Sequence, residues 1–113
     1  MGSFALITGA SKGIGKAIAI ELAKQKIDLL LIARSAEKLD ELTHYIKKTY
    51  NVKVHYLSID LSITNAARKV YDWCTQNDHT IHILINNAGY GLAGTFDKYP
   101  SADYVAIDRK STR

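Results

Sequence analysis

The sequence predicts an α/β fold built around a doubly wound parallel sheet, with helices on both faces. Short apolar runs alternate with longer segments whose apolar residues recur at helical spacing. A segment rich in glycine separates the first apolar run from the first helical segment. Strands separated by helices of about a dozen residues run parallel, and right-handed crossovers between them place helices on both faces of the sheet.

Two strands and two helices are expected in the first half of the chain. The first strand covers residues 4–7 and the second covers residues 29–33, because both runs are short, continuous and apolar. Apolar residues at helical spacing follow each run: Ile14, Ala17, Ile18 and Leu22 after the first, and Leu39, Leu42 and Ile46 after the second.

The second half of the chain repeats this order and adds a fourth strand. A third strand is expected around residues 52–57, where apolar and polar residues alternate, and a fourth at residues 81–85. The helix between them is expected from Ile63, Ala66, Ala67, Val70 and Cys74. Alternation suits an edge strand, as in a four-stranded sheet with the order 3-2-1-4. Pro100 introduces what reads as a short final helix from Ser101, and no fifth strand is expected.

The composition predicts one soluble domain. Hydrophobic residues make up 47% of the 113 residues and charged residues 23%, close to the average for globular proteins. The longest apolar run, residues 29–33, is too short to cross a bilayer. No signal peptide is evident, and Leu6 stands where an acylation motif favours Ser or Thr. We therefore expect no membrane contact and a cytoplasmic location.

The net charge of +4 raises the question of which anions the protein binds. Lysines and arginines are spread along the chain, so a nucleic-acid partner is not expected, whereas nucleotide phosphates are favoured ligands. The histidines show no metal-ligand spacing, so no metal site is expected. The single cysteine, Cys74, falls at helical spacing among apolar residues and is expected to be buried.

The glycine-rich segment runs from Thr8 to Gly15 and reads Thr-Gly-Ala-Ser-Lys-Gly-Ile-Gly. Glycines at this place let backbone N–H groups approach a pyrophosphate, and the following helix N-terminus adds unpaired donors and partial positive charge. A strand-to-helix turn also uses one or two glycines for geometry alone, so that interpretation stays open. If the turn binds a dinucleotide, the residues involved are Gly9, Ser11, Lys12, Gly13, Ile14 and Gly15. The spacing Gly-x-x-x-Gly-x-Gly after a strand resembles the fingerprint of the short-chain dehydrogenase/reductase family, whose fold is Rossmann-like.

Two further segments carry the same resemblance. Residues 86–89 read Asn-Asn-Ala-Gly, a signature that this family places after its fourth strand, and the resemblance implies that Asn87, Ala88 and Gly89 border the cofactor. Asp60-Leu61 follows the third strand, where the family has an acidic residue that contacts the adenine ring. Asp60 could instead, or in addition, cap a helix.

The choice of dinucleotide depends on the residues at the end of the second strand. Rossmann domains that select NAD place Asp or Glu there to bind the ribose hydroxyls. Here Arg34 occupies that place, and a guanidinium suits a 2′-phosphate. Lys12 adds a second positive charge, and in the family basic residues in these two places accompany NADP preference. We therefore expect NADP(H) to be preferred over NAD(H); the alternative is that Arg34 and Lys12 are solvated surface charges.

The catalytic residues of the family have no counterpart in this chain. The family uses a tyrosine that passes a proton to or from the substrate oxygen, with a lysine four residues later. None of the seven tyrosines has a lysine four positions later, and the catalytic serine of the family lies on a fifth strand. No catalytic residue is therefore assigned. Without a fifth strand, the fourth would expose an apolar edge, through which we expect self-association.

The resemblance covers residues 1–108, which are expected to form an NADP-binding half-domain, followed by an unrelated polar tail at residues 109–113. A truncated reading frame, a gene remnant or a fragment would each explain this pattern. The resemblance implies hydride transfer between NADP(H) and an alcohol or carbonyl substrate, with this chain supplying the nucleotide half of the site and inactive alone. The alternatives are a noncatalytic nucleotide-binding module and a nonfunctional remnant.

Overall fold

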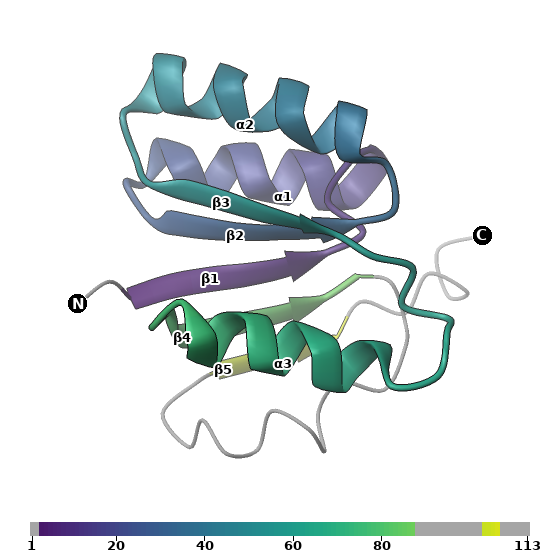
Figure 1. The fold of residues 1–113 in the computed structure, drawn as a ribbon. Coiled ribbons are helices and arrows are strands. Elements are labelled where there is room, and N and C mark those ends of the chain that lie inside the picture. Colours follow the sequence, from purple (N-terminus) through teal and green to yellow (C-terminus); the bar gives the residue numbers. More distant parts are fainter. Residues whose placement is uncertain (1–2, 88–102, 107–113) are drawn as a thin grey trace.

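The computed structural model describes residues 3–87 and 103–106. Within these residues the strands are β1 (Ser3–Thr8), β2 (Asp28–Ala33), β3 (Val54–Ser58), β4 (Thr80–Asn86) and β5 (Asp103–Ala106). They form one parallel sheet in the order β3-β2-β1-β4-β5. Helices α1 (Gly13–Lys24) and α2 (Ala36–Tyr50) cover one face, and α3 (Ala66–Gln76) covers the other (Figure 1). The first four strands have the order 3-2-1-4, so the prediction of a doubly wound Rossmann-like sheet is confirmed.

The two central strands, β1 and β2, pack apolar side chains on both faces of the sheet. Ile7 and Leu31 belong to a core cluster beneath α1 and α2, whereas Leu6 and Leu30 belong to a cluster beneath α3. All four side chains are fully buried. Successive side chains of a strand point to opposite faces, so a strand covered on both sides needs a continuous apolar run. The apolar runs of the sequence therefore became the centre of the sheet.

Helix α1 turns a face of small residues toward the sheet. Its buried residues are Gly15, Ala19 and Ala23, whereas Ile14, which belonged to the expected apolar set, is 40% exposed. Small side chains let the helix backbone lie close to the strands beneath it. The helix prediction is confirmed, but the face that packs deepest is not the expected one.

Helix α3 begins later than its apolar pattern suggested. It starts at Ala66, with Asn65 at the N-cap position. Ile63 was expected inside the helix, but it precedes the first turn and is 47% exposed. Cys74 on the inner face of α3 is buried as predicted, and burial raises the pKa of its thiol to about 12.

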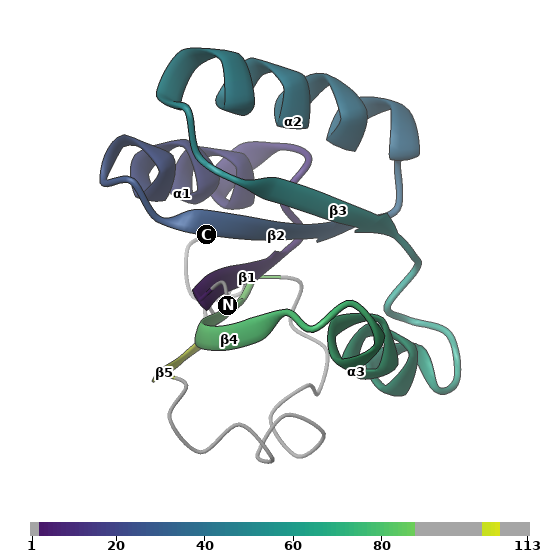
Figure 2. The same cartoon turned by 60° about the vertical axis from the view of Figure 1, so that its left-hand side comes forward.

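The expected final helix and the expected open edge of the fourth strand are both wrong for the residues that the structure describes. Asp103–Ala106 forms β5, which lies beside β4 (Figure 2). The two strands pair in parallel, with Leu84 opposite Tyr104. A short apolar run with Tyr and Val cannot be distinguished from a helical segment by periodicity alone. The unpaired edge of β4 offers backbone partners that favour a strand. Self-association through that edge therefore loses its structural basis.

Several sequence predictions fall on residues outside the described ranges. These are the cofactor neighbours Ala88 and Gly89, the start of a helix at Ser101, and the boundary between residues 1–108 and 109–113. Among the helices that the structure describes, none has the length and apolar character needed to cross a membrane.

Candidate dinucleotide-binding cleft

A cleft of about 580 Å³ opens at the carboxyl ends of β1, β2 and β3. In a doubly wound sheet ligands bind at the carboxyl ends of the strands, beside the point where the strand order reverses, which here lies between β1 and β4. The cleft brings together six of the residues that the sequence singled out: Gly9, Ser11, Lys12, Arg34, Asp60 and Leu61. They come from the segments after three different strands, and they meet because these parallel strands end at the same edge of the sheet.

The turn between β1 and α1 depends on two glycines for different reasons. Gly13 has a φ of +61°, a left-handed conformation that side-chain-bearing residues rarely adopt, although space is open around it. Gly15 has no room for a Cβ atom, which would overlap the Gly9 carbonyl oxygen and lie 2.8 Å from Asn87 Nδ2. The turn is therefore shaped by backbone conformation at one position and by close packing at the other.

The N-terminus of α1 has donors to offer an anion. Lys12 occupies the N-cap position in an extended conformation, and no side chain caps the helix. The Lys16 N–H donates to the Lys12 carbonyl at 3.4 Å, so the N–H groups of residues 13–15 precede the first intrahelical bond. The first turn also holds no acidic residue that would compete with an anionic ligand.

Asn87, just after β4, is tied to the glycine turn. Its Nδ2 donates to the Gly9 carbonyl oxygen at 3.2 Å, and the residue is only 1% exposed. Its Oδ1 is buried and has no hydrogen-bond partner among the described residues. Asn86 lies beside it, where its Oδ1 accepts a hydrogen bond from Thr8 Oγ1 at 3.2 Å. Asn86 and Asn87 therefore hold the end of β1 and the glycine turn in place through hydrogen bonds and do not line the cleft.

One end of the cleft is formed where β2 ends. The Ser58 hydroxyl donates to the Arg34 carbonyl oxygen at 2.6 Å, and the Ile59 N–H donates to the Ala33 carbonyl at 2.8 Å. These bonds hold the backbone around Arg34 while its side chain stays exposed. Among the described residues the Arg34 guanidinium forms no ion pair within 4.0 Å. The Arg34 side chain therefore lines the cleft as a cation without an ion-pair partner among the described residues.

Asp60 forms a turn and does not cap a helix. Its Oδ1 accepts hydrogen bonds from the Ser62 N–H at 2.9 Å and the Ser62 hydroxyl at 2.6 Å. These bonds, with a smaller contribution from the charge of Arg34, lower the pKa of Asp60. Because α3 begins only at Ala66, the alternative that Asp60 is a helix cap is wrong. An ionised carboxylate therefore lines the cleft together with Lys12 and Arg34.

Five residues of the cleft were missed by sequence reasoning: Ala33, Ser35, Lys38, Ile59 and Ser62. Four of them are direct neighbours of predicted residues, and proximity in sequence could have indicated them. Lys38 is different, because it lies in the first turn of α2 and enters the cleft from the helix. A Ser three residues before it, in a typical N-cap position, was the available signal.

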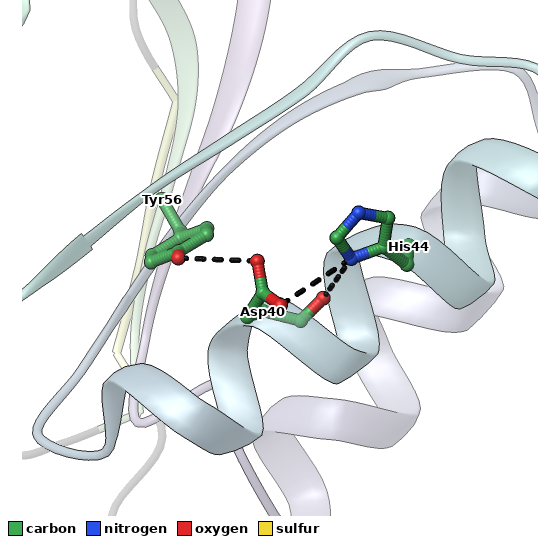
Figure 3. Close-up of polar contacts among 3 residues, drawn as sticks. All are labelled: Asp40, His44 and Tyr56. Carbon is green, nitrogen blue, oxygen red and sulfur yellow. Dashed lines mark hydrogen bonds and ion pairs between the residues drawn. The ribbon is translucent and has the colours of Figure 1, made fainter.

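A second polar group lies away from this cleft, on the outer side of α2 and β3. Figure 3 shows Asp40 between Tyr56 and His44. The Tyr56 hydroxyl donates to Asp40 Oδ1 at 3.3 Å, and His44 Nδ1 lies 2.9 Å from the Asp40 carbonyl oxygen. Burial and the charge of Asp40 raise the pKa of Tyr56. No residue of this group lines the dinucleotide cleft.

Comparison with known proteins agrees with this geometry. A family model described as short chain dehydrogenase matches residues 3–107. Hydroxysteroid dehydrogenase-like protein 1 from Gallus gallus is 40% identical over 90 residues, covering 78% of this chain and 26% of that protein. Very-long-chain 3-oxoacyl-CoA reductase from Mus musculus is 36% identical over 105 residues, covering 91% of this chain and 33% of that protein.

Solved structures give the same result. L-sorbose reductase from Gluconobacter frateurii, complexed with NADPH and L-sorbose, superposes with a TM-score of 0.73 and 34% identity over 80% of this chain and 34% of that one. A short-chain dehydrogenase from Sphingobium yanoikuyae in complex with NADPH gives a TM-score of 0.69 and 36% identity over 80% of this chain and 35% of that one. The chain thus spans about a quarter to a third of the length of the curated relatives cited above. It belongs to the short-chain dehydrogenase family.

Proposed function

We propose that this chain binds NADP(H) and forms the nucleotide-binding part of an oxidoreductase that acts on an alcohol or carbonyl substrate. The observation that carries the proposal is the cleft at the carboxyl edge of the sheet, in which Lys12 and Arg34 converge from separate segments. A carboxylate that would hold the ribose hydroxyls of NAD is absent from the end of β2. The charge of the cleft suits a 2′-phosphate.

The residues of the cleft fit a dinucleotide at three places. The uncapped N-terminus of α1, with the N–H groups of residues 13–15, would hold the pyrophosphate. Because Gly15 has no Cβ, the first turn of α1 can lie against the Gly9 carbonyl oxygen, where a Cβ atom would overlap. Asp60 and Leu61 border the adenine end, and Lys12 and Arg34 border the ribose that carries the 2′-phosphate.

The nicotinamide ring, when bound, supplies the hydride donor or acceptor of the reaction. The residues of this chain bind and orient the other end of the cofactor. Asn87 holds the glycine turn in place through the Gly9 carbonyl and so acts on the ligand indirectly. Ala88 and Gly89, which lie outside the described residues, stay predicted neighbours of the cofactor on the family resemblance alone.

A noncatalytic nucleotide-binding module is the second candidate. The observation that favours it is the sequence itself, in which no tyrosine is followed four residues later by lysine. The two candidates share the nucleotide site and differ in whether the 113-residue chain transfers a hydride.

Calorimetric titration of the purified chain with NADP⁺ and NAD⁺ tests the shared proposal. We expect saturable binding that favours NADP⁺ and a smaller preference in Arg34→Ala. Equal affinity of the parent chain for both dinucleotides, or a preference that is unchanged in Arg34→Ala, would contradict the assignment of Arg34. A spectrophotometric assay of NADPH oxidation with ketone and aldehyde substrates then separates enzyme from binding module.

A further inference from the structure

Lys38 lies between two adjoining clefts. It lines the dinucleotide cleft together with Lys12 and Arg34. It also lines a second cleft of about 640 Å³ between α1 and α2, together with Lys12 and Lys16. Lys12 and Lys38 therefore line both clefts, at the ribose end of the proposed nucleotide site.

The fold holds the backbone of Lys38 in place. The Ser35 side chain caps α2 by accepting a hydrogen bond from the Lys38 N–H at 3.2 Å. Ser35 directly follows Arg34, whose carbonyl is bonded to Ser58. The cap therefore couples the position of Lys38 to that of Arg34 through a short, hydrogen-bonded segment. Because the backbone of Lys38 is already ordered, binding an anion in the cleft would have to order only its side chain.

The charge of Lys38 is not neutralised by the described part of the chain. The ion pairs within residues 3–87 join His44 to Asp40 and Arg68 to Asp72. Two carboxylates line the clefts: Glu41 in the second cleft, and Asp60 in the first, where it is bonded to Ser62. Neither lies within ion-pair distance of Lys38, so the ammonium remains available to an anion.

We propose that Lys38 is a specificity-determining residue that binds the ribose 2′-phosphate together with Arg34 and Lys12. This inference rests on the proposed nucleotide-binding function. A phosphate monoester carries a charge of about −1.5 to −2 at pH 7 and several acceptor oxygens, so it can be shared by three cations from separate segments. The neutral 2′-hydroxyl of NAD gains nothing from a third cation. Lys38 would therefore increase the preference for the phosphorylated ligand without changing the affinity for NAD.

Lys16 provides a matched control. It has the same side chain, is exposed and lines the second cleft with Lys38, but it does not line the dinucleotide cleft. If Lys38 acts only through the general positive field of this surface, Lys16→Gln and Lys38→Gln will have equal effects. If Lys38 contacts the phosphate, only Lys38→Gln will affect the preference.

The experiment measures the affinity of the full chain and of each variant for 2′,5′-ADP, 3′,5′-ADP and 5′-AMP by calorimetry. We expect Lys38→Gln to weaken 2′,5′-ADP binding roughly three- to tenfold, the range of one exposed charge-assisted contact. Binding of 5′-AMP should change less than about twofold, as should all binding by Lys16→Gln. Lys38→Arg should restore the 2′,5′-ADP affinity. Thermal unfolding midpoints check that every variant is folded.

Each other outcome overturns a defined part of the proposal. An unchanged affinity of Lys38→Gln for 2′,5′-ADP, with Arg34→Ala still impaired, would refute the role of Lys38 and leave the proposed function intact. Equal losses in Lys16→Gln and Lys38→Gln, or equal losses for 2′,5′-ADP and 3′,5′-ADP, would show a nonspecific field and refute the 2′-phosphate contact. If the unsubstituted chain binds none of the three nucleotides, the proposed function itself fails.

Discussion

Asn87 and Gly9 are joined by a hydrogen bond of 3.2 Å from the Asn87 side-chain amide to the Gly9 carbonyl oxygen, across 78 positions of the sequence. The same two groups are the nearest neighbours of a Cβ atom built at Gly15. The end of β4, the turn after β1 and the first turn of α1 therefore meet at one point. The shape of the glycine turn depends on this contact, although Asn87 itself lies outside the cleft.

Gly15→Ala should destabilise the chain and abolish dinucleotide binding. The added methyl group would overlap backbone atoms of Gly9, which cannot rotate away, so α1 must shift from the sheet. Overpacking of this kind costs about 1–3 kcal/mol of unfolding free energy. Urea unfolding and calorimetric titration with NADP⁺ measure both effects.

Gly13→Asn is the control for that substitution. The space around Gly13 is open, and Asn tolerates its left-handed conformation. We expect Gly13→Asn to lower the free energy of unfolding by less than about 1 kcal/mol. Equal losses for the two variants would show that close packing at Gly15 is not what limits the turn.

Asn87→Asp should destabilise the chain at neutral pH more than at acidic pH. An ionised carboxylate cannot donate to the Gly9 carbonyl and would be buried beside it, at a cost of about 1–3 kcal/mol or more. Burial raises the pKa of such a carboxyl, and its protonated form can donate again. The stability difference from the parent chain should therefore shrink as the pH falls. A difference that stays constant between neutral and acidic pH would argue against the hydrogen bond.

The stacked pair His55 and His79 should make the chain less stable in mild acid. Their rings lie 4.8 Å apart, next to Phe4 and Trp73. Burial lowers the pKa of both; Lys47 and Lys53 add to the effect at His55, and His55 adds to it at His79. Asp28 and Asp78 act in the opposite direction on His55 and His79, respectively.

The unfolded chain then binds more protons than the folded chain, so these histidines reduce stability as the pH falls below about 6.5. In His79→Phe the decline of unfolding free energy between about pH 7.5 and pH 5.5 should be smaller than in the parent chain. The substitution His44→Gln, at an exposed site, serves as the comparison. If His79→Phe and the parent chain decline in parallel, the stacked pair does not contribute.

Val105→Pro should open the edge of the sheet beside β4. Val105 of β5 pairs with Ile85 of β4. Proline removes a backbone donor and is poorly accommodated in paired strands. We expect faster hydrogen exchange of β4 amides and concentration-dependent self-association by light scattering. Val105→Ala keeps the backbone donor and should behave like the parent chain. Unchanged exchange in Val105→Pro would mean that β5 does not protect β4.

The sequence by itself determined the sheet order of the first four strands and which strand ends border the candidate cleft. A continuous apolar run such as residues 29–33 needs both faces of its strand to be buried. This burial is typical of a parallel sheet with helices on each side. The glycines and Arg34 then follow strand ends, and strand ends of a parallel sheet share one edge. Local sequence patterns were sufficient because each of these residues directly follows a strand that the apolar pattern identifies.

Only the tertiary structure decided which residues meet across that edge and how the sheet ends. Lys38 enters the cleft because the Ser35 cap sets where α2 begins, and Asp60 bonds Ser62 because α3 begins only at Ala66. Asp103–Ala106 became a strand because the edge of β4 could accept its backbone hydrogen bonds. The β4–β5 pairing and the meeting of three loops at the cleft join segments far apart in the chain, and periodicity carries no information about them.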